Sequence, residues 1–168
     1  MIALATIGLS LLTQFVADLF GIKLPEQEQT KIAYYIGTHC LESAQHFKAF
    51  LQLLLMVLVF APVAEETLFR LPTRLTWKRK AWVWALCAVL ISALFSFSHY
   101  PDYTVLFKGQ GFRLNPPDGA FVALFFFGLA QCWLYLRTRS IWCAMLNHLL
   151  FNATNLALMF MFPQLVGA

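Results

Sequence analysis

The sequence predicts an all-α protein, a polytopic membrane helix bundle with about five transmembrane helices. Three observations lead to this fold class. Hydrophobic residues make up 60% of the 168 residues and charged residues only 12%, far from the composition of a soluble domain. The apolar residues gather in runs close to the ~20 that a helix needs to cross a bilayer. Short basic stretches separate these runs, as in the loops beside membrane spans.

The chain is predicted to form a single membrane domain, residues 1–168, in two parts. The first part, 1–46, holds an apolar span over 2–22 and a polar connection. No lysine or arginine precedes this span, so it lacks the charged start of a cleavable signal peptide and is expected to stay in the membrane. The second part, 47–162, holds the core helices, which are predicted over 47–77, 81–99, 119–136 and 140–162.

Pro62 lies inside the first of these core helices. A proline in a helix interior removes one backbone hydrogen bond and clashes with the preceding turn. We therefore predict a kink just before residue 65. The backbone groups that such a kink frees must find partners within the protein, and a polar cavity would supply them.

The polar connection carries a small group of potential ligands: His39, Cys40, Glu42 and His46. Their spacing matches no common zinc pattern. We therefore predict a solvated loop or a surface helix in this region, and no metal site.

The net charge of +4 comes from basic residues that stand beside the apolar runs. We interpret them as orientation signals, with the short loops facing the cytoplasm, and as contacts to membrane lipids. They do not indicate a nucleic-acid-binding surface. Membrane lipids are thus expected partners of the chain, and nucleic acids are not.

Two adjacent carboxylates mark the centre of the core. Glu65 and Glu66 follow an apolar run in a chain that has only eight acidic residues. Glu66 and Arg70 are four residues apart with the acid first, the order that favours an ion pair on a helix. Glu65 lies about 100° around the helix, with Phe69 as its i+4 neighbour. Because carboxylates at bilayer depth usually face a partner or a wet cavity, unpaired Glu65 is the candidate for chemistry.

Polar side chains on two other core helices complete a candidate site. His99 ends the span 81–99, and His148 and Asn152 project from one face of the span 140–162. Taken singly, His99 is typical of a membrane interface and the other two are typical of hydrogen bonds between helices. With a rise of ~1.5 Å per residue, all of these groups average near mid-bilayer. Their joint occurrence on separate helices favours an active site.

The three groups also resemble the motifs of a known family. In this order, Glu65-Glu-x-x-x-Arg70, Phe95-x-x-x-His99 and His148-x-x-x-Asn152 are similar to those of the CAAX-protease and bacteriocin-processing (CPBP, Abi) family, which includes the type II prenyl-protein endopeptidase. The resemblance covers residues 60–155. Many bacterial members have a glycine after the motif-one arginine, whereas this chain has Leu71-Pro72, a difference that affects the local path of the helix.

The resemblance implies a glutamate-dependent intramembrane protease that needs no cofactor. Glu65 would act as the general base on a water, and His99 would hold and polarise that water. His148 and Asn152 would donate hydrogen bonds to the oxyanion, and Glu66 with Arg70 would support the site from behind. These roles suit an apolar site, where a carboxylate holds a proton more tightly and fixed donors stabilise an oxyanion better than water does.

Two other classes stay open from the residues alone. Glu65, His99 and His148 make a two-histidine, one-carboxylate set that suits zinc, although the chain has no HExxH motif. The same polar residues would also lock together the helices of a non-enzymatic scaffold, chaperone or transporter subunit. For a protease, prenylated CAAX proteins, leader peptides and other membrane peptides are all candidate substrates. The expected location is the plasma membrane of a bacterium or an archaeon.

Overall fold

A computed structural model describes residues 28–101, 109, 111–115 and 120–162 of the chain. Over these residues the fold is a bundle of helices, and the only β-pairing there is an isolated bridge between Pro101 and Leu114. The prediction of an all-α helix bundle is confirmed. The helices are α2 (Glu28–Thr38), α3 (Ala44–Leu55), α4 (Ala61–Arg70), α5 (Ala81–Phe97), α7 (Ala120–Thr138) and α8 (Ile141–Met161). A π-helical stretch, η1 (Met56–Phe60), joins α3 to α4, and a 3-10 helix, η2 (Leu71–Thr76), follows α4.

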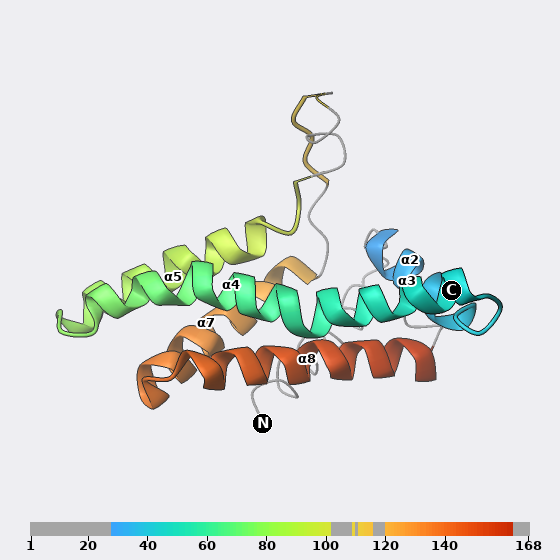
Figure 1. Cartoon of the computed structure of the whole chain (residues 1–168). Helices are drawn as coiled ribbons and strands as arrows, with labels where there is room; N and C mark the ends of the chain where they lie inside the picture. Colours follow the sequence, from blue (N-terminus) through green and yellow to red (C-terminus); the bar gives the residue numbers. More distant parts are fainter. Residues whose placement is uncertain (1–27, 102–108, 110, 116–119, 163–168) are drawn as a thin grey trace.

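Four long helical segments run side by side through the bundle (Figure 1). By length and composition, three of them can cross a membrane: Ala44–Thr76, which combines α3 to η2, together with Ala120–Thr138 and Ile141–Met161. Helix α5 is equally apolar but has 17 residues. These bounds lie within three residues of the predicted core spans. The predicted span 2–22 lies outside the described residues.

The chain accommodates Pro62 with a π-helical turn and not with a break in the helix. The Ala61 N–H bonds to the Met56 carbonyl, five residues back, and Pro62 has no N–H to offer. The helix continues through both residues, and Figure 1 shows no sharp bend there. The prediction of a kink is therefore wrong, because the helix does not change direction at Pro62. The freed backbone group that it implied is present, at the Val57 carbonyl.

Helices α5 and α7 approach closely because small residues lie at their contact. A Cβ added to Gly128 would lie 2.9 Å from Ser92 Cβ and 3.1 Å from Ser92 Cα. Ser96 Oγ donates a 2.7 Å hydrogen bond to the Phe121 carbonyl across the same contact. Small residues and hydroxyl donors are typical of packed helices in membranes, where lipid tails compete with apolar side chains.

The apolar core lies where three helices meet. It consists of Phe95 from α5, Phe127 from α7 and Phe151 from α8, with Phe69 of α4 packed against it. The rings of Phe127 and Phe151 stack with centroids 4.3 Å apart. Many large apolar side chains on the outer surface are exposed, among them Leu68, Trp82 and Leu94, as expected for helices that face lipid.

The predicted surface helix is present in the polar connection as α2. His39, Cys40 and Glu42 lie in the turn between α2 and α3, and His46 lies in the first turn of α3. The Glu42 carboxylate is 3.7 Å from His39 Nε2 and 3.6 Å from His46 Nδ1. Ser43 caps α3 by accepting a hydrogen bond from the His46 N–H. All of these side chains are exposed or half-exposed.

Candidate active site

The ion pair predicted between Glu66 and Arg70 forms, and it is completely buried. Arg70 Nε donates to Glu66 Oε2 at 2.9 Å, and neither side chain has any exposed surface. The guanidinium also lies 4.8 Å from the centroid of the Phe95 ring. Arg70 Nη1 is 4.0 Å from Cys132 Sγ, and Nη2 has no partner among the described residues. Glu66 is thus the main electrostatic partner of a buried cation.

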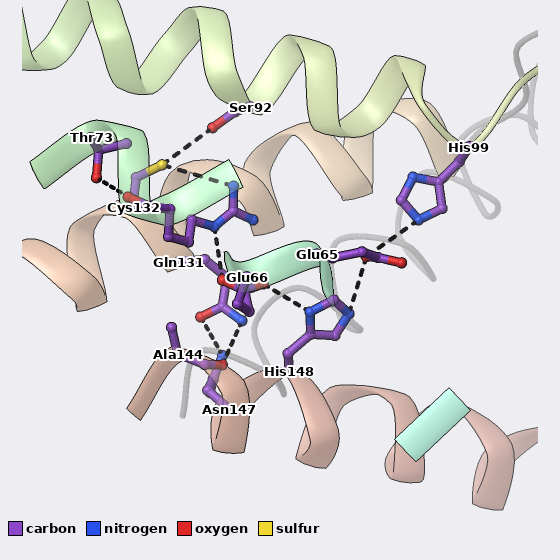
Figure 2. Close-up of polar contacts among 11 residues, drawn as sticks. Glu65, Glu66, Thr73, Ser92, His99, Gln131, Cys132, Ala144, Asn147 and His148 are labelled. Carbon is purple, nitrogen blue, oxygen red and sulfur yellow. Dashed lines mark hydrogen bonds and ion pairs between the residues drawn. The ribbon is translucent and has the colours of Figure 1, made fainter. Parts of the chain in front are cut away.

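Glu66 has a second partner, which lies on α8. Its other carboxylate oxygen, Oε1, is 2.8 Å from His148 Nδ1. A carboxylate can only accept, so the Nδ1–H of His148 donates this bond. The bond holds the ring plane of a histidine that comes from a helix 82 residues away in sequence. His148 is almost completely buried, and Figure 2 shows it between the two glutamates.

Glu65 faces two histidines, one in the turn just after α5 and one on α8 (Figure 2). Its Oε2 atom lies 3.9 Å from His99 Nε2 and 3.8 Å from His148 Nε2. These separations are too long for hydrogen bonds, and this oxygen makes none within the described part of the chain. The Glu65 and His99 side chains are 27% and 32% exposed, although the Oε2 atom itself is shielded from solvent. Glu66, Arg70 and His148 are buried.

Both histidines present the same nitrogen to Glu65. His99 Nδ1 is 2.9 Å from the Phe95 carbonyl, which can only accept, so that Nδ1 carries a proton. His148 Nδ1 carries one because it donates to Glu66. In its neutral form each ring then directs the lone pair of Nε2 toward Glu65, and in its charged form it directs an N–H there. The Nδ1 partners therefore fix which atom of each ring takes part in chemistry.

Asn152 occupies a different place from the histidines. Its Nδ2 donates a 2.8 Å hydrogen bond to the Val57 carbonyl in the π-helical stretch. Neither Ala61, whose N–H goes to Met56, nor Pro62 can bond this carbonyl. One N–H of the Asn152 amide thus satisfies the backbone group that the π-helical turn frees, and its second N–H is left for a ligand.

An apolar groove runs between α4–η2 and α5, directly beside these residues. It has a volume of about 570 Å³ and is lined by Leu68, Phe69, Pro72, Ile91, Leu94, Phe97, Ser98 and Pro101. Leu68 and Phe69 lie one helical turn after Glu65, and Ser98 precedes His99. The groove therefore borders the pair of helices that carry Glu65 and His99.

A comparison with known protein families gives one match. A family model of Rce1-like type II CAAX prenyl endopeptidases matches residues 47–154, well over half of the chain. The chain belongs to this family. The matched segment begins at the start of the first core helix and ends just after Asn152. No curated protein and no solved structure matches the chain.

Membership of the Rce1-like family, together with the long apolar helices, places the chain among integral membrane proteins and among the CAAX-type intramembrane proteases. The three motifs seen in the sequence lie on α4, on the end of α5 and on α8. The structure brings Glu65, Glu66, Arg70, His99 and His148 into one cluster. Asn152 lies one turn further along α8 than His148 and contacts α3–η1 instead.

The geometry also bears on the zinc alternative. Two ligands of a tetrahedral zinc, each 2.0–2.1 Å from the metal, are about 3.3–3.4 Å apart. Glu65 Oε2 is about half an ångström farther than this from both histidine Nε2 atoms. Among the described residues, no group of three or more His, Cys, Asp or Glu side chains has the geometry of a metal site. Zinc would require the three side chains to close in.

Sequence reasoning missed a second polar layer behind the site. Gln131 is completely buried on α7, donates to the Ala144 carbonyl at 3.1 Å and accepts from Asn147 Nδ2 at 3.3 Å. These bonds join α7 to α8 one turn before His148 (Figure 2). A glutamine within an apolar span, 16 residues before an asparagine in the next span, was the available signal. Such pairs are typical of hydrogen bonds between membrane helices.

Proposed function

We propose that this protein is an intramembrane endopeptidase in which Glu65 activates a water for attack on a peptide bond. The observation that carries the proposal is the convergence of Glu65 Oε2 and two histidine Nε2 atoms at 3.8–3.9 Å. At separations beyond about 3.5 Å, polar groups that do not bond directly can be bridged by one water. Family membership supplies the reaction class, and the partial exposure of Glu65 and His99 provides access for a substrate.

In the proposed reaction, Glu65 takes a proton from the water while the water oxygen attacks the scissile carbonyl carbon. His99 orients the water through Nε2. When the tetrahedral intermediate collapses, Glu65 returns the proton to the leaving nitrogen, so the products are a carboxylate and an amine.

The oxyanion would be stabilised from α8. His148 can donate from Nε2 only when its ring carries both protons, because Nδ1 already donates to Glu66. Asn152 would contribute the N–H that is not bonded to Val57. Donors held in place before the reaction are the usual source of oxyanion stabilisation in acyl transfer.

The proposed substrate is a membrane-anchored peptide, either a prenylated CAAX terminus or a leader peptide. The apolar groove beside Glu65 supports this proposal because it offers an apolar chain a place next to the scissile bond. We further propose the plasma membrane as the location.

A direct test uses purified protein in detergent with two quenched fluorescent substrates, a farnesylated CAAX peptide and an unprenylated leader peptide. Cleavage of either one by the wild type, and its loss in Glu65→Gln, is expected. A Glu42→Gln variant serves as the matched control, because it makes the same substitution at an exposed carboxylate in the turn between α2 and α3, outside the candidate site. If neither peptide is cleaved, or if Glu65→Gln cleaves as fast as the wild type, the proposed mechanism is wrong.

A further inference from the structure

One end of the bundle is strongly basic, and none of the described residues at this end is acidic. Figure 1 shows that the α4–α5 connection and the turn between α7 and α8 lie at the same end, on the left. The sequence has no Asp or Glu between Glu66 and Asp102, and none after Asp118. The exposed basic side chains at this end are Arg74, Lys78, Arg79, Lys80, Arg137 and Arg139.

Two of these arginines differ from the others because they converge on one indole ring. Arg139 Cζ lies 4.1 Å from the centroid of the Trp77 ring, and Arg74 Cζ lies 5.9 Å from it. Trp77 is itself held against Tyr135 of α7, with ring centroids 4.8 Å apart. The two guanidiniums therefore come from separate segments, η2 and the α7–α8 turn, and each lies near the same aromatic platform, the Trp77 ring.

Two observations show unused capacity for an anion at this platform. Neither guanidinium has a carboxylate partner within the described part of the chain. Helix α8 begins just after Arg139, and its N-cap Ser140 makes no side-chain capping bond, so the positive end of this helix also faces the turn.

The backbone of Arg139 adds an independent argument. Its φ angle is +56°, in the left-handed region that an arginine rarely adopts. This residue follows α7 and its N–H bonds to the Tyr135 carbonyl at 2.9 Å, the position in a helix-terminating turn where glycine is preferred. A large cation thus stands where the backbone favours glycine, and its guanidinium is placed on Trp77. Strain of this kind is found at ligand sites.

We infer that Arg74, Trp77 and Arg139 form a binding site for the phosphate group of an anionic membrane phospholipid. A phosphate oxygen can accept from each guanidinium and relieve the repulsion between the two cations. The lipid is favoured over a soluble anion because exposed Leu75 and Trp142 beside these residues offer apolar surface for acyl chains. Basic pockets at the ends of membrane helices are a common form of headgroup recognition.

Such a lipid would link the two halves of the active site. η2 directly follows α4, which carries Glu65, and Thr73 Oγ1 donates to the Arg70 carbonyl at 2.7 Å. The α7–α8 turn leads into the helix that carries His148. A phosphate bound by both segments would hold the ends of α4–η2 and α8 together. The site itself does not depend on the proposed catalytic mechanism.

The test measures lipid binding and not proteolysis. Purified full-length protein in detergent is titrated with dioleoylphosphatidylglycerol, with dioleoylphosphatidylcholine or with inorganic phosphate, and bound lipid is counted by native mass spectrometry. The wild type is expected to retain one phosphatidylglycerol in preference to phosphatidylcholine. Arg74→Gln and Arg139→Gly should each weaken that binding about fivefold or more, since a cation near a lipid surface contributes about 1 kcal/mol.

The controls separate a defined site from general attraction. Arg139→Gly relieves the positive φ, so this variant should melt no lower than the wild type, and its loss of lipid cannot be assigned to unfolding. The double variant Lys78→Gln/Lys80→Gln removes two cations from the same end and should weaken binding less than Arg139→Gly alone. The inference is overturned if the double variant weakens binding as much, if both lipids bind equally, or if equimolar inorganic phosphate displaces the phosphatidylglycerol.

Discussion

The two adjacent glutamates should respond in opposite ways to the same substitution. Glu66→Gln keeps the shape of the side chain but removes the charge that neutralises buried Arg70. Breaking a buried ion pair by removing one partner typically costs about 3–5 kcal/mol of unfolding free energy. Arg70 has no other close carboxylate among the described residues, so we expect this loss of unfolding free energy in full. A hydrogen bond from Arg70 to the new amide oxygen would offset about 1 kcal/mol of it.

Glu66→Gln should also change His148. If the new amide oxygen accepts from Arg70, its NH₂ group faces His148 Nδ1, which must then become the acceptor. The His148 ring then loses the charged acceptor that holds its Nε2 atom toward Glu65. We therefore expect lower activity per folded molecule, in addition to a melting temperature lowered by roughly 4–16 °C for a loss of about 2–4 kcal/mol.

Glu65→Gln should leave stability unchanged and abolish cleavage. Glu65 Oε2 makes no hydrogen bond within the described residues, so exchanging it for an amide strands no partner. Losing a general base costs about 10²–10⁴ in rate. The assay combines thermal unfolding with single-turnover cleavage for both variants and for Glu42→Gln. A stable but inactive Glu66→Gln together with an active Glu65→Gln would reverse the two assignments.

Three further predictions concern the oxyanion, the metal and the helix packing. Asn152→Ala should lower turnover about 10²–10³-fold more than it changes substrate affinity. It should also lower the melting temperature slightly, because the Val57 carbonyl loses its donor. If the variant turns over substrate at the wild-type rate, Asn152 only joins helices. Activity should survive chelation, and stoichiometric zinc in active protein, with loss on chelation and recovery on re-addition, would establish the zinc mechanism instead. Gly128→Ala should destabilise the protein by about 1–3 kcal/mol because the new Cβ would press on the Ser92 backbone. In a thermal unfolding assay, the added substitution Ser92→Gly should restore part of this loss. An unchanged melting temperature for Gly128→Ala alone would contradict the close approach of the two helices.

Much of the fold could be predicted from the sequence because it depends on short-range patterns. Long apolar runs bounded by basic residues predicted the core helices to within three residues at each end. The spacing of Glu66 and Arg70 was enough to predict their ion pair, since residues four apart on a helix are always neighbours. The Pro62 prediction was right about a freed carbonyl and wrong about the bend, because a π-helical turn accommodates a proline without changing the direction of the helix.

The relations between helices could not be read from those patterns. That His148 bonds Glu66 through Nδ1 and faces Glu65 through Nε2 depends on the register of α8 against α4. That register follows from packing, including the bond of Gln131 to the Ala144 carbonyl and the bond of Asn152 to the Val57 carbonyl. In the same way, only the tertiary structure places Asn152 on the Val57 carbonyl and Arg139 on Trp77. The local sequence is enough to predict which residues lie on each helix, because helix formation depends on contacts within a few turns of chain. Packing over many tens of residues decided which atoms meet.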